Sequence, residues 1–313
     1  MQRINYTIMN FILFLSLSLS AGWVWSKSLK VVTTSTDLES LAKTIGGERV
    51  EAQSLASPKQ DLHFVDAKPS LILKLMKADL FIENGMELEV GWAPLLVHSS
   101  GNPLIQAGAQ GHLDASAAIE ALDVPLNPNR AMGDVHPAGN PHYLTDPENG
   151  KRVAQLISNK LCDFSPNDAE YFKQNLAGFD KKMDLKIREW IDLMAPYRGV
   201  PYVSYHKDVA YFAKRFGLNS VGEIEPKPGI PPTAQHIADL ISRMQTGKIK
   251  LIITQLWHEP RTPESIAKNT GAKIFTFIQF PGGVEAARDN IGAVDYNVHQ
   301  ILNLLSGSAG ETH

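Results

Sequence analysis

The first half of the chain alternates between short apolar runs and amphipathic segments. Apolar and often β-branched residues fill positions 29–36, 50–55 and 78–82, and each run predicts a buried strand. Helical spacing follows Asp37, a suitable N-cap, and recurs at positions 69–76. Strands that alternate with helices are typical of a parallel sheet in an α/β protein.

A long amphipathic segment follows Ser165 and Pro166, which suit a helix start, and runs to about residue 193 with Gly178 as its only later glycine or proline. Its apolar residues recur at steps of three and four: Tyr171, Leu176, Phe179, Met183, Ile187, Trp190, Ile191 and Met194. This spacing predicts one helix of roughly 40 Å. A helix of that length can cross between two domains as a rigid backbone.

The α/β pattern starts again after the long segment. Strands are predicted at 200–205, 249–254 and 274–278, and helices at 209–216, 234–244, 263–268 and the C-terminal end. A chain of 313 residues suits two domains. We therefore predict an α/β fold with two lobes, each a mainly parallel sheet flanked by helices, joined by one long rigid helix. The predicted divisions are a signal peptide at 1–26, an N-terminal lobe at 27–160, the linking helix at 161–195 and a C-terminal lobe at 196–313.

The first 26 residues have the pattern of a signal peptide. A polar start is followed by an apolar run at 8–19 that is too short and too serine-interrupted to predict a membrane span. Val24 and Ser26 suit cleavage after Ser26, cleavage after Ala21 is an alternative, and an uncleaved anchor is the other interpretation. Because no cysteine lies near the cut, we expect a free periplasmic protein without a lipid anchor.

Composition narrows the function further. The net charge of −3 gives no electrostatic reason to expect nucleic-acid binding. Cys162 is the only cysteine, so an intramolecular disulfide is impossible, and a thiolate zinc site would need more cysteines.

Four of the ten histidines lie where an α/β protein collects binding groups. His63 is in the loop after the second predicted strand, His136 and His142 are in a loop dense in proline and glycine, and His206 ends a predicted strand. Zinc binds imidazole nitrogen readily. Asp146, four residues after His142, could orient an imidazole from behind. Each histidine taken alone also suits a solvated loop, a polar turn or a helix cap.

Four segments resemble motifs of one family, the metal-specific solute-binding proteins of ABC transporters, a group with zinc-binding and manganese-binding members and the adhesin-type lipoproteins. They are HFVDAKP at 63–69, ADLFIENGMELE at 78–89, NPHYLTDP at 140–147 and HKDVAYFAKRFGL at 206–218. The first has one residue more before its proline than the family pattern. The long helix falls where the family has its interdomain helix, and the resemblance spans essentially the whole mature chain.

The resemblance implies metal ligands at His63, His142 and His206, together with a carboxylate from the end of the last strand. The sequence departs from the family at that last position, because residues 275–283 read FTFIQFPGG and contain no acid. The candidates for a fourth ligand are Gln279, Glu259, His136 and a water molecule.

The resemblance also implies a function. The chain would capture a transition metal reversibly and deliver it to a membrane ABC permease. The histidine-rich set favours zinc, with manganese, which prefers oxygen ligands, as the alternative. We expect a periplasmic monomer that is not an enzyme, and we expect metal binding to weaken as the pH falls through the histidine range.

Three other functions stay open from the sequence. Three histidines and a water also make a catalytic zinc site, with Glu225 or Glu259 as the base, although neither a His-Glu-x-x-His segment nor a nucleophile elbow is present. A surface adhesin is a second alternative, which the missing lipid-anchor cysteine disfavours. A binder of a small organic ligand is the third, with Trp92, Trp257 and Tyr143 lining the pocket, although aromatic residues at such spacings usually belong to a core.

Overall fold

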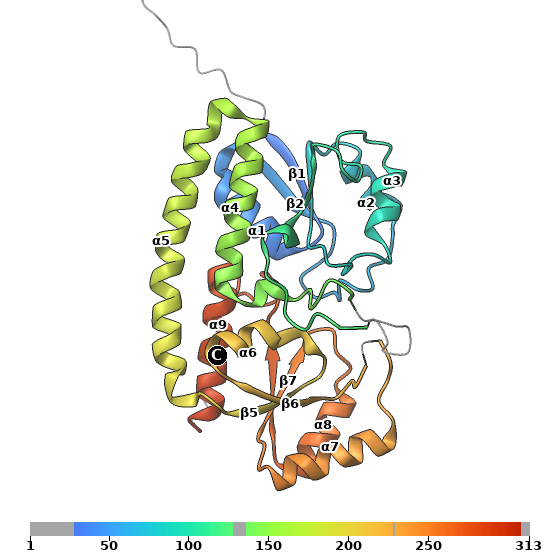
Figure 1. Cartoon of the computed structure of the whole chain (residues 1–313), viewed down its shortest axis with the longest axis vertical. Helices are drawn as coiled ribbons and strands as arrows, with labels where there is room; N and C mark the ends of the chain where they lie inside the picture. The colour runs from blue at the N-terminus through green and yellow to red at the C-terminus, as the bar shows by residue number, and fades with distance from the viewer. Residues whose placement is uncertain (1–27, 128–135, 228, 308–313) are drawn as a thin grey trace, which may run out of the picture.

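The computed structural model describes residues 28–127, 136–227 and 229–307, and it shows two lobes connected along one side by long helices (Figure 1). The predicted signal peptide lies outside the described residues. Each lobe contains a parallel four-stranded sheet with helices around it. The predicted fold class is therefore confirmed.

The N-terminal lobe has the strand order β2-β1-β3-β4. Its strands are β1 (Leu29–Thr33), β2 (Val50–Ser54), β3 (Leu80–Glu83) and β4 (His112–Asp114), and its helices are α1 (Thr36–Gly46), α2 (Pro69–Leu75) and α3 (Ala93–Ser99). In the register of the sheet, Thr33 pairs with both Ser54 and Ile82. The sequence pattern did not predict α3 or β4, and β4 has only three residues.

The C-terminal lobe has the strand order β6-β5-β7-β8, which repeats the order of the first lobe. Its strands are β5 (Pro201–Ser204), β6 (Asn219–Glu223), β7 (Leu251–Gln255) and β8 (Lys273–Phe277). Its helices are α6 (Ala210–Phe216), α7 (Ala234–Thr246), α8 (Arg261–Thr270) and α9 (Asn290–Leu305). The pattern did not predict β6, whose residues are exposed or half-buried at the sheet edge and therefore carry no apolar signal.

The predicted linking helix at 161–195 is in fact two helices. Residues 161–164 are the end of α4 (Pro147–Phe164), a short turn follows, and the long helix α5 spans Ala169–Met194. Ser165 stands before Pro166 and has φ −136° and ψ 77°, since a residue before proline is disfavoured in the helical region. The sequence analysis missed α4, because its first residues lie inside the segment that was assigned to a proline- and glycine-rich loop.

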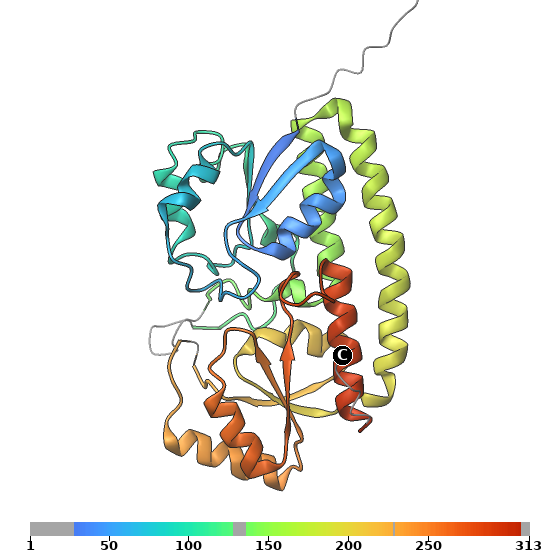
Figure 2. The same ribbon diagram turned by 180° about the vertical axis from the view of Figure 1, so that it is seen from behind.

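One face of α5 packs into both lobes. Its buried residues are Phe172, Leu176, Phe179, Met183, Ile187, Trp190 and Met194. They belong to a single apolar cluster that also contains Val31 of β1 and Phe275 of β8. The helix packs against α1 and α4 at one end and against α9 at the other (Figure 2). The two lobes are therefore held together by a shared core, and Tyr171 and Ile191, predicted for the apolar face, are only partly buried at its margin.

The carboxyl ends of the strands in both sheets lead into the loops between the lobes. The loop after β2 carries His63, His206 follows β5, and Gln279 follows β8. Binding groups collect at this edge in parallel α/β sheets, because each strand there ends in a loop that faces the same way.

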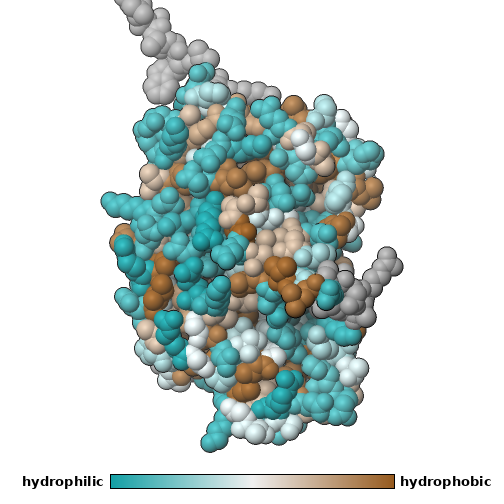
Figure 3. Space-filling model, in the orientation of Figure 1, coloured by the Kyte–Doolittle hydropathy of each residue, from teal (hydrophilic) through white to brown (hydrophobic). Residues whose placement is uncertain are grey.

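The described surface is largely polar. Hydrophilic residues cover most of the face shown in Figure 3, and apolar patches interrupt them near the middle of the molecule. In the part of the chain that the structure describes, no helix combines the length and the apolar character that a membrane span needs.

We predict that the shared core is sensitive to truncation along the buried face of α5. Met183 is 1% exposed and Leu185, two residues on, is 55% exposed. Met183→Ala should lower the free energy of unfolding by about 2–5 kcal/mol, because it leaves a cavity between the lobes. The matched control Leu185→Ala should change it by less than about 0.5 kcal/mol. Urea unfolding measures both values, and equal effects would contradict the shared core.

Candidate metal centre

His63 is held by a carboxylate from its own loop. Asp61 Oδ1 accepts a hydrogen bond from the His63 backbone N–H at 2.9 Å and lies 2.7 Å from Nδ1 of the His63 ring. The indole of Trp92 anchors the same loop by donating to the carbonyl of Leu62 at 2.6 Å. With Nδ1 engaged, Nε2 is the nitrogen of His63 that is left for a ligand.

His142 lies in a loop that is fixed from both sides. Its backbone N–H donates to the side-chain oxygen of Asn140 at 3.0 Å, and the Asn140 amide donates to the carbonyl of Lys207 at 2.8 Å. The Tyr211 hydroxyl, on α6, donates to the Asn140 carbonyl at 2.8 Å. The loop before α4 is therefore bonded to the C-terminal lobe.

The N-terminal lobe holds the same loop through Asn84. The Asn84 amide donates to the carbonyl of Pro141 at 2.9 Å, and the Tyr143 hydroxyl donates to the Asn84 carbonyl at 2.6 Å. The ring of His142 is 6% exposed. Its Nδ1 faces the amide of Gln279 at 3.3 Å, and its Nε2 is buried without a partner among the described residues.

His206 follows β5 and is held by a carboxylate from another segment. Its Nδ1 lies 3.2 Å from Glu225 Oε2, and the backbone N–H of Glu225 donates to the carbonyl of Tyr205 at 2.9 Å. The His206 side chain is 11% exposed.

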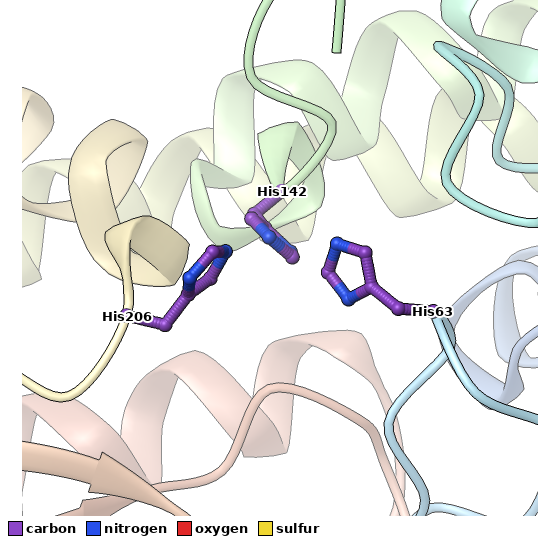
Figure 4. A group of neighbouring side chains, drawn as sticks. All are labelled: His63, His142 and His206. Carbon is purple, nitrogen blue, oxygen red and sulfur yellow. The ribbon is translucent and has the colours of Figure 1, made fainter. Parts of the chain in front are cut away.

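The three rings converge between the lobes (Figure 4). One ring nitrogen from each of His63, His142 and His206 lies within 4.8 Å of one from each of the others, and the ring centroids are 5.4–5.6 Å apart. Because Nδ1 of every ring faces another side chain, the Nε2 atoms are those that can share a ligand. Two ligands of a tetrahedral zinc lie about 3.3 Å apart for Zn–N bonds of about 2.0–2.1 Å, so a small movement closes this group around a metal ion.

The rings line a cleft of ≈ 360 Å³ with walls from both lobes. Asp61 and His63 belong to one wall, and His206, Asp208 and His258 to the other. The cleft is thus deep enough to hold a small ion and wide enough to admit it.

Burial and the neighbouring rings favour the neutral forms of His142 and His136. Burial, followed by the charges of His206, His63 and His136, holds the pKa of His142 well below its usual value. Burial and the same kind of repulsion lower the pKa of His136 to about 4. A neutral imidazole has the lone pair that a metal requires.

His206 differs from its neighbours. Burial disfavours its charged form, but the hydrogen bond to Glu225 and the charge of Asp208 outweigh burial and raise its pKa. Asp208 is itself buried, which raises its pKa to about 7, and its Oδ2 has no hydrogen-bond partner among the described residues. Positive charge at the cleft is therefore best tolerated on the side of the C-terminal lobe.

The sequence analysis missed several groups behind the three rings. His258 stacks on Tyr205 with centroids 4.1 Å apart, accepts the backbone N–H of Gln255 on Nδ1, and lies 3.8 Å from Asp208 through Nε2. Glu225 was considered only as a catalytic base. A carboxylate two residues before His63 is a sequence signal for an orienting group, but nothing in the sequence links Glu225 to His206.

The three candidates for a fourth ligand lie in different relations to the rings. Nε2 of His136 is 3.1 Å from Nε2 of His63, so it reaches the side of the ring that faces the centre. Gln279 contacts Nδ1 of His142 instead. Glu259 accepts backbone N–H groups of Arg261 and Thr262 in the first turn of α8.

The expected role of Asp146 is not what the structure shows. Its carboxylate accepts two hydrogen bonds from Arg215, from Nε at 2.8 Å and Nη2 at 2.9 Å, and it caps α4 by accepting the N–H of Glu148. The side chains that face imidazole nitrogens are Asp61, Glu225 and Gln279 rather than Asp146. The prediction from spacing was wrong because Asp146 caps the start of α4, and its carboxylate faces Arg215 of α6.

Two of the aromatic residues considered for an organic pocket belong to the core. Trp92 is 2% exposed and Tyr143 is fully buried. Trp257 lines the cleft and stacks on Phe280 with centroids 5.4 Å apart. The cleft combines Phe64, Tyr205 and Trp257 with several imidazoles and carboxylates, a lining that fits an ion better than an apolar ligand.

Comparisons with known proteins point in the same direction. A model of the family described as ZnuA, Zinc-uptake complex component A periplasmic, matches residues 31–303. The manganese ABC transporter substrate-binding lipoprotein PsaA of Streptococcus pneumoniae is 25% identical over 261 residues, 81% of this chain and 80% of that protein. The iron-binding protein YfeA of Yersinia pestis is 27% identical over 255 residues, 79% of this chain and 76% of YfeA.

Solved structures share the fold. A crystal structure of ZnuA has a TM-score of 0.75 at 21% identity and covers 89% of this chain and 99% of its own. A Mn-bound periplasmic metal binding protein from Candidatus Liberibacter asiaticus has a TM-score of 0.73 at 17% identity, with 89% and 100% covered. Both have the two-lobed architecture described above.

We predict that the Asp146–Arg215 pair stabilises the contact between α4 and α6. Arg215→Met should lower the free energy of unfolding by about 2–3 kcal/mol, because it leaves the Asp146 carboxylate, 8% exposed, without its partner. Asp146→Asn should cost less, because asparagine also caps helices. In a double-mutant cycle followed by urea unfolding, strictly additive effects would contradict a direct pair.

Proposed function

The chain belongs to the ZnuA family of zinc-uptake periplasmic components, and on that premise we propose that it captures a zinc ion between its lobes and delivers it to an ABC permease. The observation that supports this most directly is the convergence of His63, His142 and His206, one from each of three separate segments. The proposed ligands are the Nε2 atoms of these three rings. PsaA is named as a substrate-binding lipoprotein and YfeA as an iron-binding protein, so binding and release, rather than catalysis, is the role proposed here.

Ligand chemistry supports zinc over manganese. The groups that converge are imidazoles, which suit zinc, whereas manganese prefers oxygen ligands. Asp61 and Glu225 hold the rings through Nδ1 instead of adding oxygen to the centre. The family also includes proteins named for manganese and for iron, so the choice of metal rests on these side chains and not on the fold.

We propose His136 as the fourth ligand. Its separation of 3.1 Å from Nε2 of His63 suits two ligands of one tetrahedral zinc ion. Its pKa of about 4 keeps the ring neutral at physiological pH. Gln279 and Glu259 are each bonded elsewhere, to His142 Nδ1 and to the start of α8.

The arrangement supports a carrier more than a hydrolase. A catalytic zinc keeps an open position for water and needs a base beside it. The carboxylates of Asp61 and Glu225 are engaged with Nδ1 atoms, and Glu259 is engaged with α8. A fourth imidazole would fill the position that a catalytic water requires.

We propose that the protein is located in the periplasm, which the predicted signal peptide at 1–26 would allow the chain to reach. The proposed units are the lobes at 27–160 and 196–313, with the segment at 161–195 between them. We propose that the protein acts as a monomer, since the three rings and both walls of the cleft come from one chain. Release to a permease would then need only a relative movement of the lobes that separates His206 from the other two rings.

We predict one tight zinc ion per chain. After chelation, added zinc should raise the free energy of unfolding by about 4 kcal/mol at a concentration 1,000 times Kd, and manganese should compete poorly. His142→Ala and His206→Ala should each lower zinc affinity by orders of magnitude while the metal-free protein stays folded, because each removes one ligand of a small set. Calorimetric titration and thermal unfolding give these values.

The matched control is His98→Ala, an exposed histidine on α3 away from the cleft, which should bind zinc like the wild type. Unchanged affinity in both ligand variants would refute the site. Tighter binding of manganese than of zinc would refute the choice of metal and leave the family role intact.

We also predict that the two carboxylates behind the rings tune affinity. Asp61→Asn and Glu225→Gln should each weaken zinc binding by about 10- to 100-fold, because each group fixes the orientation and raises the basicity of a ligand. Glu259→Gln, on the same wall of the cleft as Glu225, is the control and should change affinity little. A larger loss in Glu259→Gln than in the other two would make Glu259 the fourth ligand.

A further inference from the structure

Two glutamines lie in a row behind His142. Gln279 directs its Nε2 toward His142 Nδ1 at 3.3 Å, and its Oε1 accepts from Nε2 of Gln255 at 3.4 Å. Gln255, the last residue of β7, is 3% exposed. The row therefore begins in the core of the C-terminal lobe and ends on a proposed metal ligand.

The three proposed ligands are not held alike. His63 and His206 present Nδ1 to the carboxylates of Asp61 and Glu225. An ionised carboxylate only accepts hydrogen bonds, so a neutral ring beside it keeps its proton on Nδ1 and its lone pair on Nε2. These two rings are ready to bind a metal through Nε2.

His142 carries its proton on the other ring nitrogen. The amide nitrogen of Gln279 donates to Nδ1, and a neutral imidazole whose Nδ1 accepts a hydrogen bond carries its proton on Nε2. That Nε2 is buried and has no partner among the described residues. In this tautomer His142 cannot ligate through the nitrogen that faces the other two rings.

Gln255 decides which end of the Gln279 amide faces His142. An amide has one donor end and one acceptor end, so whichever end Gln279 gives to His142, it gives the other to Gln255. The orientation of an amide follows from its hydrogen-bond network. A hydrogen bond between Gln255 and the buried carboxyl of Asp208 places the Gln255 amide nitrogen on that side, and the oxygen of Gln255 is left without a partner among the described residues.

We propose that Gln255 and Gln279 are positioning residues that keep the proton of His142 on Nε2 in the metal-free protein, and that the Gln279 amide turns over when His142 binds a metal. The second half rests on the proposed function, and the first half does not. Capture would then require Gln279 to present its oxygen to Nδ1–H and Gln255 to turn with it. His63 and His206 can bind a metal in their present tautomers, whereas His142 must first change its tautomer. This requirement weakens binding and favours release.

The test is the tautomer of each histidine in the metal-free protein, read by long-range ¹H–¹⁵N NMR on ¹⁵N-histidine-labelled full chain at pH 8. We expect the Nδ1–H form for His63 and His206 and the Nε2–H form for His142, whose signals are identified by their loss in His142→Ala. Zinc should convert His142 to the Nδ1–H form. An Nδ1–H form of His142 in the metal-free wild type would overturn the proposal.

The decisive variant is Gln255→Met, which adds no charge and does not touch His142. Freed from Gln255, the Gln279 amide should turn over, shifting His142 toward Nδ1–H and tightening zinc binding by about tenfold. Gln279→Glu replaces the donor by an acceptor and should give the Nδ1–H form even if Gln255→Met fails to fold. Gln245→Met, on the exposed face of α7, is the control and should change neither the tautomer nor the affinity.

The outcomes separate the two proposals. An unchanged His142 tautomer in Gln255→Met or in Gln279→Glu would refute the role of the glutamines. Failure of the wild type to bind zinc, with His142 still in the Nε2–H form, would refute the proposed function and leave the tautomer assignment standing.

Discussion

The apolar face of α5 packs into both lobes at once, and the geometry of the cleft depends on that packing. Residues such as Met183 and Trp190 share one cluster with strands of both sheets, so the distance between the two sheet edges is set by close-packed side chains. The rings of His63 and His206, which follow β2 and β5, can therefore bring nitrogens within 4.8 Å of each other, although more than a hundred residues separate them in the chain. A flexible linker in the place of α5 would leave each histidine a solvated loop residue.

The loop that carries His142 is the second part of this construction. It enters α4 at the boundary of the lobes and is bonded to Asn84 on one side and to Lys207 and Tyr211 on the other. The central ligand is thus held by hydrogen bonds to both lobes. This arrangement gives a physical route by which opening of the cleft would change the ligand set in one step.

Charge is layered around the rings. At the centre, burial and the neighbouring imidazoles lower the pKa of His142 and His136, whereas at His206 burial is outweighed by Glu225 and Asp208, which raise its pKa. Carboxylates lie one layer out, on Nδ1 of His63 and His206, and an amide takes that place behind His142. Solved structures of ZnuA and of a Mn-bound periplasmic protein share this fold, so selectivity must come from which atoms point inward and how firmly they are held. Gln255 and Gln279 create one such difference, because an amide faces Nδ1 of His142 where carboxylates face Nδ1 of His63 and His206.

Sequence periodicity was sufficient for the buried strands and the long helix, since a segment that buries one face along its length selects apolar residues at fixed spacing. It was insufficient for β4, β6 and α3, which are short or exposed, and for the break between α4 and α5. His63, His142 and His206 could be singled out because parallel strands collect binding groups at their carboxyl ends. Their partners could not, because Glu225 and Gln279 reach the rings only after separate segments fold together, and Asp146 was drawn to Arg215 by a helix start that spacing does not reveal. The burial of a helix or strand can be predicted from its own residues, because it depends on the spacing of apolar side chains. The contacts that fix the proton and orientation of a histidine ring form only when distant segments pack together.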